Sequence, residues 1–185
     1  MTARKPLLEA LVAMLTSDDV LVSSLGANSR YLPHLKVVAP VFALCDSMGA
    51  AIPLALGMAL QRPERHVVAL EGDGSLLMCP NVLATVAAAR PANLTALLWV
   101  NGHYESSGGQ PLPAAPVDWP SVAKGFGIAH AERVGDVPAL RAAFPRARAA
   151  KAPALLVVDV AFDPNEAIPP YSERPDEIRA RFRIP

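Results

Sequence analysis

The feature of this sequence that most constrains its fold is a regular alternation of apolar runs with helical patterns. The apolar runs predict strands at residues 19–24, 40–44, 66–72, 94–100, 128–134 and 154–160. The patterns between them predict helices at 6–16, 47–61, 80–90, 118–125 and 136–150, and a short or distorted helix near Pro33. Because the strands are apolar almost throughout, both faces of their sheet need to be covered. The sequence therefore predicts an α/β fold, a three-layer doubly wound parallel sheet of about six strands with helices on both faces.

The length of the chain suits one domain of this kind. Of its 185 residues, we expect 1–162 to form the domain and 163–185 to form a proline-rich C-terminal tail. Segment 102–117, with several prolines and two adjacent glycines, is predicted to be a long loop. Proline disfavours regular structure, so we expect the tail to be extended and to lie on a partner chain.

Composition and charge exclude several classes of partner. The chain has 17 basic and 17 acidic residues, which gives no electrostatic reason to expect binding to nucleic acid or to an anionic membrane. The sequence is 52% hydrophobic and 18% charged, which favours an oligomer interface. Cys45 and Cys79 are far apart and lack metal-type spacing, so a reducing cytoplasm is expected. No run is long and apolar enough to cross a bilayer, and the basic, apolar start is predicted to be an amphipathic helix.

Polar and glycine-rich residues follow four of the predicted strands. These groups are Ser24–Gly26, Asp46–Gly49, Gly72–Ser75 and Asn101–Glu105. In parallel α/β sheets, ligands bind at the carboxyl ends of the strands, beside the starts of helices. We therefore expect all four groups to meet at one edge of the sheet and to form the binding site there.

Asp73, between two glycines, indicates a particular ligand chemistry. A tight turn is the simpler interpretation of Gly72-Asp73-Gly74, and the same is true of Asn101-Gly102. The alternative is that the glycines let the backbone approach a phosphate. A carboxylate would repel that phosphate unless a cation lay between them, and Mg²⁺ accepts such oxygen ligands. Asn101 would then supply a second oxygen from the neighbouring strand end.

At this point the sequence resembles the thiamine-diphosphate-dependent decarboxylase superfamily. The motif GDGSLLM is followed by an asparagine 28 residues after its aspartate, from Asp73 to Asn101. The segments SMGAAIPLALGMAL, GHYESSGGQP and VLVSSLGANSR resemble the helix below the cofactor, a loop and the first strand of sulfopyruvate and phosphonopyruvate decarboxylases. The resemblance is to the diphosphate-binding (β) subunit, and it implies the thiamine-diphosphate-binding fold.

The resemblance also implies roles for individual residues. Asp73, Asn101 and the backbone carbonyl of His103 would bind Mg²⁺. The remaining cofactor-binding residues would be Ser24, Gly26, Asp46, Ser47, Met48, Gly72, Gly74, Ser75, Tyr104 and Glu105. Among these, Met48 would hold the cofactor in a bent form, and the backbone of Asp46 and Met48 would hold its aminopyrimidine ring. Met48 and His103 are the candidate catalytic residues, although Met48 also suits a plain core position. The family often has glycine where Asp46 stands.

The resemblance implies that this chain works with a second polypeptide. In the family, an activating glutamate belongs to a pyrimidine-binding domain, for which the sequence has no room. We therefore expect a separate α-type subunit that supplies the glutamate, in an α2β2 or larger assembly. The implied activity is that of a carboxy-lyase acting on sulfopyruvate or phosphonopyruvate to give CO2 and an aldehyde.

Two other functions stay open at this stage. The chain could serve another 2-oxo acid decarboxylase or a carboligase of the acetolactate-synthase kind. It could also be a non-catalytic cofactor-binding or regulatory subunit that keeps the fold. The presence of both Asp73 and Asn101 argues against the last of these, since a site without metal need not keep both.

Overall fold

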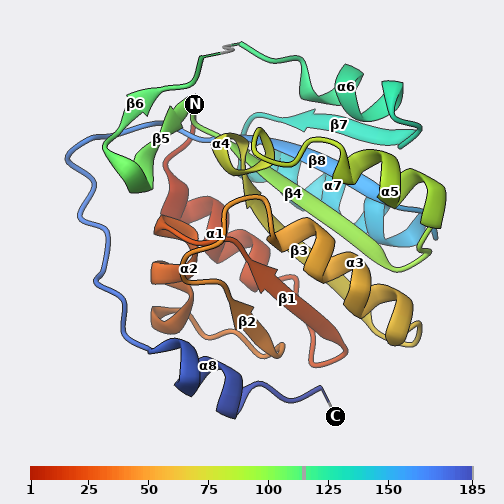
Figure 1. Cartoon of the computed structure of the whole chain (residues 1–185), viewed down its shortest axis with the longest axis horizontal. Helices are drawn as coiled ribbons and strands as arrows, with labels where there is room; N and C mark the ends of the chain where they lie inside the picture. The colour runs from red at the N-terminus through yellow and green to blue at the C-terminus, as the bar shows by residue number, and fades with distance from the viewer. Residues whose placement is uncertain (114–115, 185) are drawn as a thin grey trace.

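A six-stranded parallel sheet forms the centre of the computed structural model (Figure 1). The structure describes residues 1–113 and 116–184. The strand order is β2-β1-β3-β4-β8-β7. The strands are β1 (Asp19–Ser23), β2 (Val41–Ala43), β3 (His66–Gly72), β4 (Leu94–Val100), β7 (His130–Val134) and β8 (Ala154–Asp159). All six predicted strands are therefore confirmed, and the limits of β3 and β4 are those predicted.

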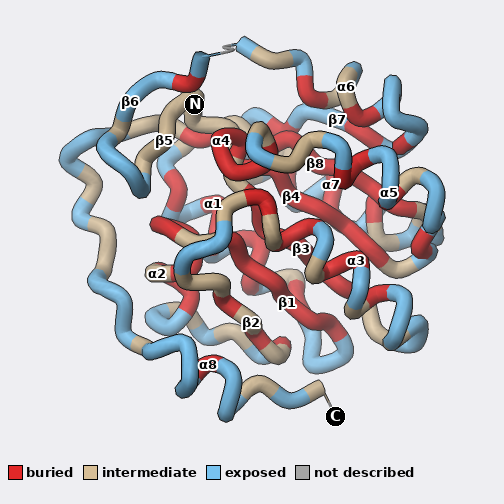
Figure 2. The backbone as a smooth tube through the Cα atoms, viewed as in Figure 1, coloured by how far each residue is buried: buried red, intermediate tan, exposed pale blue. Residues whose placement is uncertain are grey.

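Helices cover both faces of the sheet, as expected. The longer helices are α1 (Arg4–Val12), α3 (Ala51–Gln61), α5 (Val82–Ala89), α6 (Trp119–Gly125) and α7 (Val137–Ala149). The shorter ones are α2 (Ala27–Tyr31), η1 (Leu32–His34), α4 (Asp73–Leu76) and α8 (Pro175–Arg181). One apolar cluster joins the sheet to α1 and α7, and the other joins it to α3, α5 and α6. Figure 2 shows the strands as the most continuously buried part of the chain.

The alternation of side chains along each strand explains these two clusters. Leu97 and Trp99 of β4 belong to the cluster beneath α1 and α7, whereas Leu98 belongs to the cluster on the other face. Successive side chains of a strand point to opposite faces, so a strand buried on both sides is apolar throughout. This is the pattern from which the sequence predicted a parallel sheet.

The strand order fixes where a ligand is expected. β1 lies between β2 and β3, and both pair with it in parallel. The chain leaves β1 in one direction to form β2 and then crosses to the other side to form β3. In such sheets the crevice at the carboxyl ends of the two strands that flank this reversal is the usual binding site.

Several predicted boundaries are wrong for local reasons. The helix predicted at 47–61 begins at Ala51, because Gly49 has φ +73°, a conformation that a helix does not contain. The helix predicted at 6–16 is α1, which ends at Val12. The loop predicted at 102–117 contains a hairpin of β5 (His103–Tyr104) and β6 (Gln110–Pro111), with η2 (Glu105–Ser107) between them. Residues 114–115 of that loop and residue 185 of the tail lie outside the described residues.

The C-terminal segment packs in part on its own chain, and its expected contact with a partner stays a prediction. It runs down one side of the molecule to α8, which lies beside β2 (Figure 1). Ile178 of α8 is buried, and the ring of Phe182 meets that of Phe42 edge-on at 5.1 Å between centroids. The tail is therefore not extended throughout, whereas the division of the chain after residue 162 stays a prediction. None of the described helices combines the length and apolar character that crossing a membrane requires.

Candidate functional site

A pocket lies at the carboxyl ends of the central strands, where the fold predicts a ligand site. Its volume is about 70 Å³, several times the space that one water molecule needs. Ten of the predicted site residues line it: Ser24, Met48, Gly72, Asp73, Gly74, Ser75, Asn101, His103, Tyr104 and Glu105. The other lining residues are Arg4, Leu25, Ala27, Asn28, Trp99, Ser106, Ser107 and Val160. Three predicted residues, Gly26, Asp46 and Ser47, are outside this lining.

Asp73 is the buried carboxylate of the pocket. Only 2% of the residue is exposed, and each of its carboxylate oxygens accepts one backbone N–H bond. The amide of Gly74 donates to Oδ1 at 2.9 Å, and the amide of Gly102 donates to Oδ2 at 2.8 Å. Burial raises the pKa of Asp73, and the amides of Gly102 and Gly74 oppose that rise. Each oxygen keeps a lone pair, so the carboxylate can accept a further ligand such as a cation.

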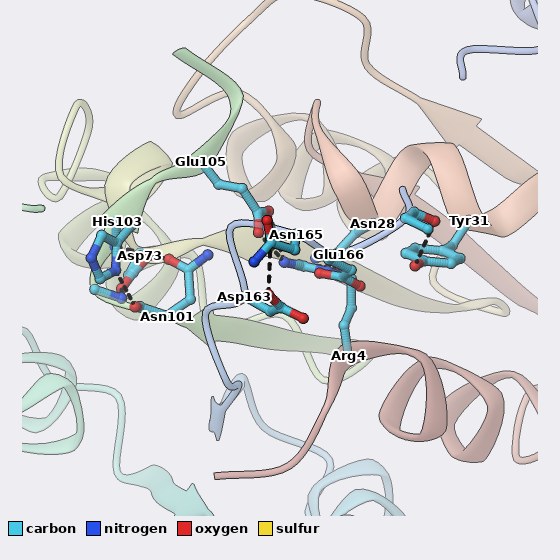
Figure 3. A network of polar contacts seen from close by, with 12 residues as sticks. Arg4, Asn28, Tyr31, Asp73, Asn101, His103, Glu105, Asp163, Asn165 and Glu166 are labelled. Carbon is cyan, nitrogen blue, oxygen red and sulfur yellow. Dashed lines mark hydrogen bonds and ion pairs between the residues drawn. The ribbon is translucent and has the colours of Figure 1, made fainter. Parts of the chain in front are cut away.

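Asn101 and His103 follow the neighbouring strand β4. The side-chain Oδ1 of Asn101 accepts the amide hydrogen of His103 at 2.9 Å. The imidazole Nδ1 of His103 lies 2.8 Å from the carbonyl oxygen of Asn101, and its ring stacks on Phe162 with 3.9 Å between centroids. These contacts fix the histidine ring against the backbone and Phe162. Figure 3 shows Asp73, Asn101 and His103 close together at this edge of the sheet.

A network of hydroxyls and one buried acid joins the other strand ends. The Oγ atoms of Ser24 and Ser75 are 3.1 Å apart, and the amide of Gly49 donates to Ser75 Oγ at 2.7 Å. Glu71, which has no exposed surface, accepts the amide hydrogen of Ala51 at the start of α3 at 3.1 Å. Burial raises the pKa of Glu71, while the hydroxyls of Ser75 and Ser24 oppose the rise. The sequence analysis did not identify Glu71, which stands within an apolar strand.

Two glycines are required by the geometry of the pocket. A Cβ atom on Gly74 would lie 2.7 Å from the ring of Tyr104, so the aromatic wall of the pocket depends on this glycine. Gly26 has φ +98°, and a Cβ there would lie 2.4 Å from Ser106 Oγ. The amide of Gly26 donates to the hydroxyl oxygen of Tyr171 at 3.0 Å, so this amide faces the C-terminal segment.

The turn before α3 carries the remaining predicted residues. Met48 is half-buried and lines the pocket, as expected of a cofactor-binding residue. Its predicted role in holding the cofactor bent stays a prediction. Asp46 and Ser47 are exposed beside it, and Ser47 Oγ lies 3.4 Å from Asp46 Oδ1. Their side chains therefore do not contribute to the pocket wall, and the contacts predicted for Asp46 involve its backbone.

The most prominent residue that the sequence analysis missed is Arg4. It is 4% exposed and is the only arginine or lysine among the described residues that line the pocket. Its guanidinium lies between Glu105, Asn28 and Glu166 (Figure 3). Burial raises the pKa of Glu105, and the charge of Arg4 opposes that rise. Arg4 is thus the local counter-charge for the acidic side of the pocket.

The donor atoms fit the Mg²⁺ and diphosphate that the resemblance implies. Asp73 offers carboxylate oxygens in a buried position, and Asn101 offers an amide oxygen from the adjacent strand end. Hard oxygen donors of this kind suit Mg²⁺, which commonly bridges a carboxylate to phosphate. Across residues 1–113 and 116–184, no three or more His, Cys, Asp and Glu side chains form a metal-type cluster. The implied set has a single carboxylate, so it is not a cluster of that kind.

Comparison with known families decides the identity of this domain. The family described as "Thiamine pyrophosphate enzyme, C-terminal TPP binding domain" matches residues 29–158, which is most of the chain. The chain belongs to this family. Thiamine pyrophosphate (TPP) is another name for thiamine diphosphate, so the resemblance found in GDGSLLM and the distant asparagine is confirmed at the level of the family.

Individual relatives support the same assignment. The phosphonopyruvate decarboxylase of Streptomyces hygroscopicus is 37% identical over 176 residues, which cover 95% of this chain and 44% of the relative. The sulfopyruvate decarboxylase subunit beta of Methanococcus maripaludis is 30% identical over 168 residues, which cover 90% of this chain and 88% of that subunit. The chain therefore spans less than half of the first relative and most of the second.

The fold is also that of solved members of the superfamily. The thiamine diphosphate-dependent 4-hydroxybenzoylformate decarboxylase of Rhodococcus jostii RHA1 matches with a TM-score of 0.74, covering 86% of this chain and 32% of that chain. Its sequence identity is 22%, so the similarity concerns the fold alone. The predicted three-layer TPP-binding fold is confirmed.

Proposed function

We propose that this chain is the β-type subunit of a split TPP-dependent 2-oxo acid decarboxylase. Its substrate is a 2-oxo acid with a distal sulfonate or phosphonate, and its products are CO2 and an aldehyde. The observation that carries this proposal is the meeting of Asp73 and Asn101 in one pocket at neighbouring strand ends. The names of the Streptomyces and Methanococcus relatives, phosphonopyruvate and sulfopyruvate decarboxylase, support the choice of substrate class.

The lengths of the two relatives support the division into subunits. The chain covers 88% of a protein named subunit beta, but only 44% of a decarboxylase that has no subunit designation. In this proposal an α-type subunit supplies the pyrimidine-binding domain and its activating glutamate. The two chains would form an α2β2 or larger assembly, with the cofactor at the interface between them.

Within the proposed site, Asp73, Asn101 and the backbone carbonyl of His103 would hold Mg²⁺. The ion would offset the repulsion between the Asp73 carboxylate and an incoming diphosphate. Ser24, Gly26, Gly72, Gly74 and Ser75 would bind near the diphosphate, and Tyr104 and Glu105 would belong to the loop on the cofactor side of the site. The burial of Asp73 strengthens its attraction for the cation, because few waters compete for the carboxylate.

The remaining proposed contacts orient the organic part of the cofactor. The side chain of Met48 would support a bent form of the cofactor, and the backbone of Asp46 and Met48 would hold its aminopyrimidine ring. Bound TPP supplies an electron sink for carbanion chemistry, which the protein positions and shields from water. The imidazole of His103, held by the carbonyl of Asn101 and by Phe162, is the proposed catalytic group from this chain on the substrate side.

The proposed reaction is balanced without an oxidant or reductant. The bond between the carboxylate carbon and the carbonyl carbon of the 2-oxo acid breaks, and its electron pair stays on the carbonyl carbon. That carbon then takes up one proton, so one 2-oxo acid and one proton give one CO2 and one aldehyde. This chain contributes binding, orientation and exclusion of water, while proton transfer to the cofactor depends on the partner's glutamate.

The first experiment identifies the reaction. The chain is co-purified with its partner subunit and given sulfopyruvate, phosphonopyruvate and pyruvate in the presence of TPP and Mg²⁺. Aldehyde and CO2 in equal amounts from one of the first two substrates is the expected result. A product with a new carbon–carbon bond would indicate a carboligase instead. Cofactor binding without turnover of any 2-oxo acid would indicate the non-catalytic subunit.

The second experiment tests the metal assignment. Asp73→Ala is expected to abolish Mg²⁺-dependent binding of TPP to the assembled complex, measured by titration calorimetry. Asp73→Asn, which keeps the shape but not the charge, should weaken it strongly. Asp18→Ala is the matched control, because Asp18 is an exposed carboxylate. It lies just before β1, at the end of that strand that is far from the pocket. Unchanged affinity in Asp73→Ala would remove the metal assignment.

A further inference from the structure

Arg4 is bound to three separate segments around the pocket. Its Nη2 lies 2.6 and 2.7 Å from the two carboxylate oxygens of Glu105 in the loop after β5. Its Nη1 donates to Asn28 Oδ1 of α2 at 3.1 Å, and its Nε donates to Glu166 Oε2 of the C-terminal segment at 3.2 Å. Four contacts from one side chain thus join α1, α2, the β5–β6 loop and the segment after β8 (Figure 3).

The position of Arg4 distinguishes it from a surface ion pair. The side chains of Glu105 and Glu166 are 15% and 16% exposed, so both carboxylates are largely removed from water. The negative charge of Asp73 also contributes to the raised pKa of Glu105, so the two carboxylates interact electrostatically. If the arginine were removed, the carboxylates of Glu105 and Glu166 would lose their counter-charge and repel each other, and Glu105 would also repel Asp73.

The geometry of the guanidinium matters as well as its charge. A guanidinium presents five N–H donors in a rigid plane, and Arg4 uses donors on all three of its nitrogens toward three different residues. A lysine ammonium is a compact point charge and cannot hold Glu105 through both oxygens while also reaching Asn28 and Glu166. A lysine at this position would therefore keep the charge and lose the arrangement.

We propose that Arg4 is a positioning residue of the cofactor site. It fixes the loop of residues 103–107 and the start of α2 against each other, so that one wall of the pocket is in place before the diphosphate enters. The inference rests on the proposed cofactor site at Asp73 and Asn101. It adds a residue from the N-terminal helix that no motif identifies, and this residue acts through its contacts with Glu105 and Asn28.

The test uses Arg4→Lys and Arg4→Gln in the assembled complex. The dissociation constant for TPP is measured by titration calorimetry at saturating Mg²⁺, at a temperature where circular dichroism shows each variant folded. Both variants should bind TPP about tenfold more weakly or worse, since the wall of the pocket is no longer held. In turnover assays, KM for TPP should rise while kcat at saturating TPP stays near the wild-type value. If Arg4→Gln fails to fold, Arg4→Lys decides.

A second substitution tests whether Arg4 acts through Glu105. Glu105→Gln in the Arg4→Gln chain removes the uncompensated carboxylate and should recover part of the lost affinity. Arg146→Gln is the matched control, because Arg146 forms an exposed ion pair with Glu132 and should leave TPP binding unchanged. No recovery in the double variant would contradict the action through Glu105.

The outcomes separate this inference from the proposed function. If the folded Arg4 variants bind TPP as the wild type does and only melt at lower temperature, Arg4 is a structural residue and the inference is wrong. That result leaves the proposed function intact as long as Asp73→Ala still abolishes binding. If Asp73→Ala binds TPP normally, or the wild-type complex does not bind it at all, the proposed cofactor site is wrong and the inference falls with it.

Discussion

His66 should make the stability of this protein depend on pH. The residue begins β3, where its Nε2 lies 3.1 Å from Thr95 Oγ1 and its ring meets Phe144 edge-on at 6.4 Å between centroids. Burial and, to a smaller extent, the charge of Arg148 lower the pKa of His66 from 6.5 to about 4, against the opposing charge of Asp19. The folded protein therefore holds this imidazole neutral at pH values where a free histidine is protonated.

The sign and size of the effect follow from linkage between protonation and folding. Between pH 6.5 and about 4 the unfolded chain binds a proton at His66 and the folded chain does not. This contribution to stability is complete above pH 6.5 and is lost as the pH falls toward 4. With these two pKa values, lowering the pH from about 7.5 to about 5 costs about 2 kcal/mol, and the loss approaches about 3 kcal/mol below pH 4.

The assay is urea unfolding, followed by circular dichroism at pH 7.5, 6.5 and 5. The free energy of unfolding of the wild type should fall more steeply with acid than that of His66→Gln, which cannot titrate. The difference between the two proteins should change by about 2 kcal/mol across this range. His130→Gln is the control, because it also removes one histidine, from an exposed position. Parallel pH dependences of wild type and His66→Gln would refute the reasoning.

Two further predictions concern packing. Gly74→Ala should cost about 1 to 3 kcal/mol and weaken TPP binding, because the new Cβ would lie 2.7 Å from the ring of Tyr104 and 3.0 Å from Leu112 Cδ2. Tyr104→Leu in the same chain should restore the stability, measured by thermal unfolding, and a failure to do so would contradict the steric explanation. Ile178→Ala should cost about 2 kcal/mol and loosen α8, because the side chain is 4% exposed. Limited proteolysis should then cut residues 163–174 faster, and an unchanged rate would contradict the anchoring role of Ile178.

The sheet could be predicted closely because its signal is local. β3 and β4 are seven-residue, mostly apolar runs bounded by polar residues or glycine. A strand that is buried on both faces of a sheet has this continuous apolar pattern, so the two strands could be recognised from the sequence. The edge strand β2 has three residues and was predicted with five, since the ends of an edge strand have fewer neighbours to fix them. In a parallel sheet the carboxyl ends of all strands lie at the same edge. The polar residues that follow each predicted strand could therefore be assigned to one pocket from the sequence.

The C-terminal helix α8 differs from the extended tail that the many prolines of this segment predict. Pro175 stands at the first position of α8, where proline is well tolerated, and Asp176 and Glu177 follow in the first turn. These are helix-start signals that the sequence contains. The packing of Ile178 and Phe182 against the domain could not be predicted in the same way, because it depends on contacts with residues far away in the chain.

The same distinction separates the predicted and the missed residues of the site. Asp73 and Asn101 were found because each directly follows or ends a strand, so the topology alone brings them together. Arg4 was missed because its partners are 24, 101 and 162 residues away, and nothing in its neighbourhood distinguishes it from a solvated helical arginine. Glu71 was missed because its neighbours in the strand are apolar, although an acid within such a run is itself a signal of a buried partner.

The electrostatics of the pocket explain why these residues belong together. Burial makes the ionised forms of Asp73, Glu71 and Glu105 costly, since the pKa of each is raised chiefly by desolvation. Glu71 is compensated by the start of α3 and by hydroxyls, and Glu105 is compensated by Arg4. Asp73 has two backbone amides and no cationic side chain among the hydrogen bonds that define it. Of the three acids, Asp73 is therefore the one left without a cationic or hydroxyl partner in these contacts, which is the position that the proposed Mg²⁺ would fill.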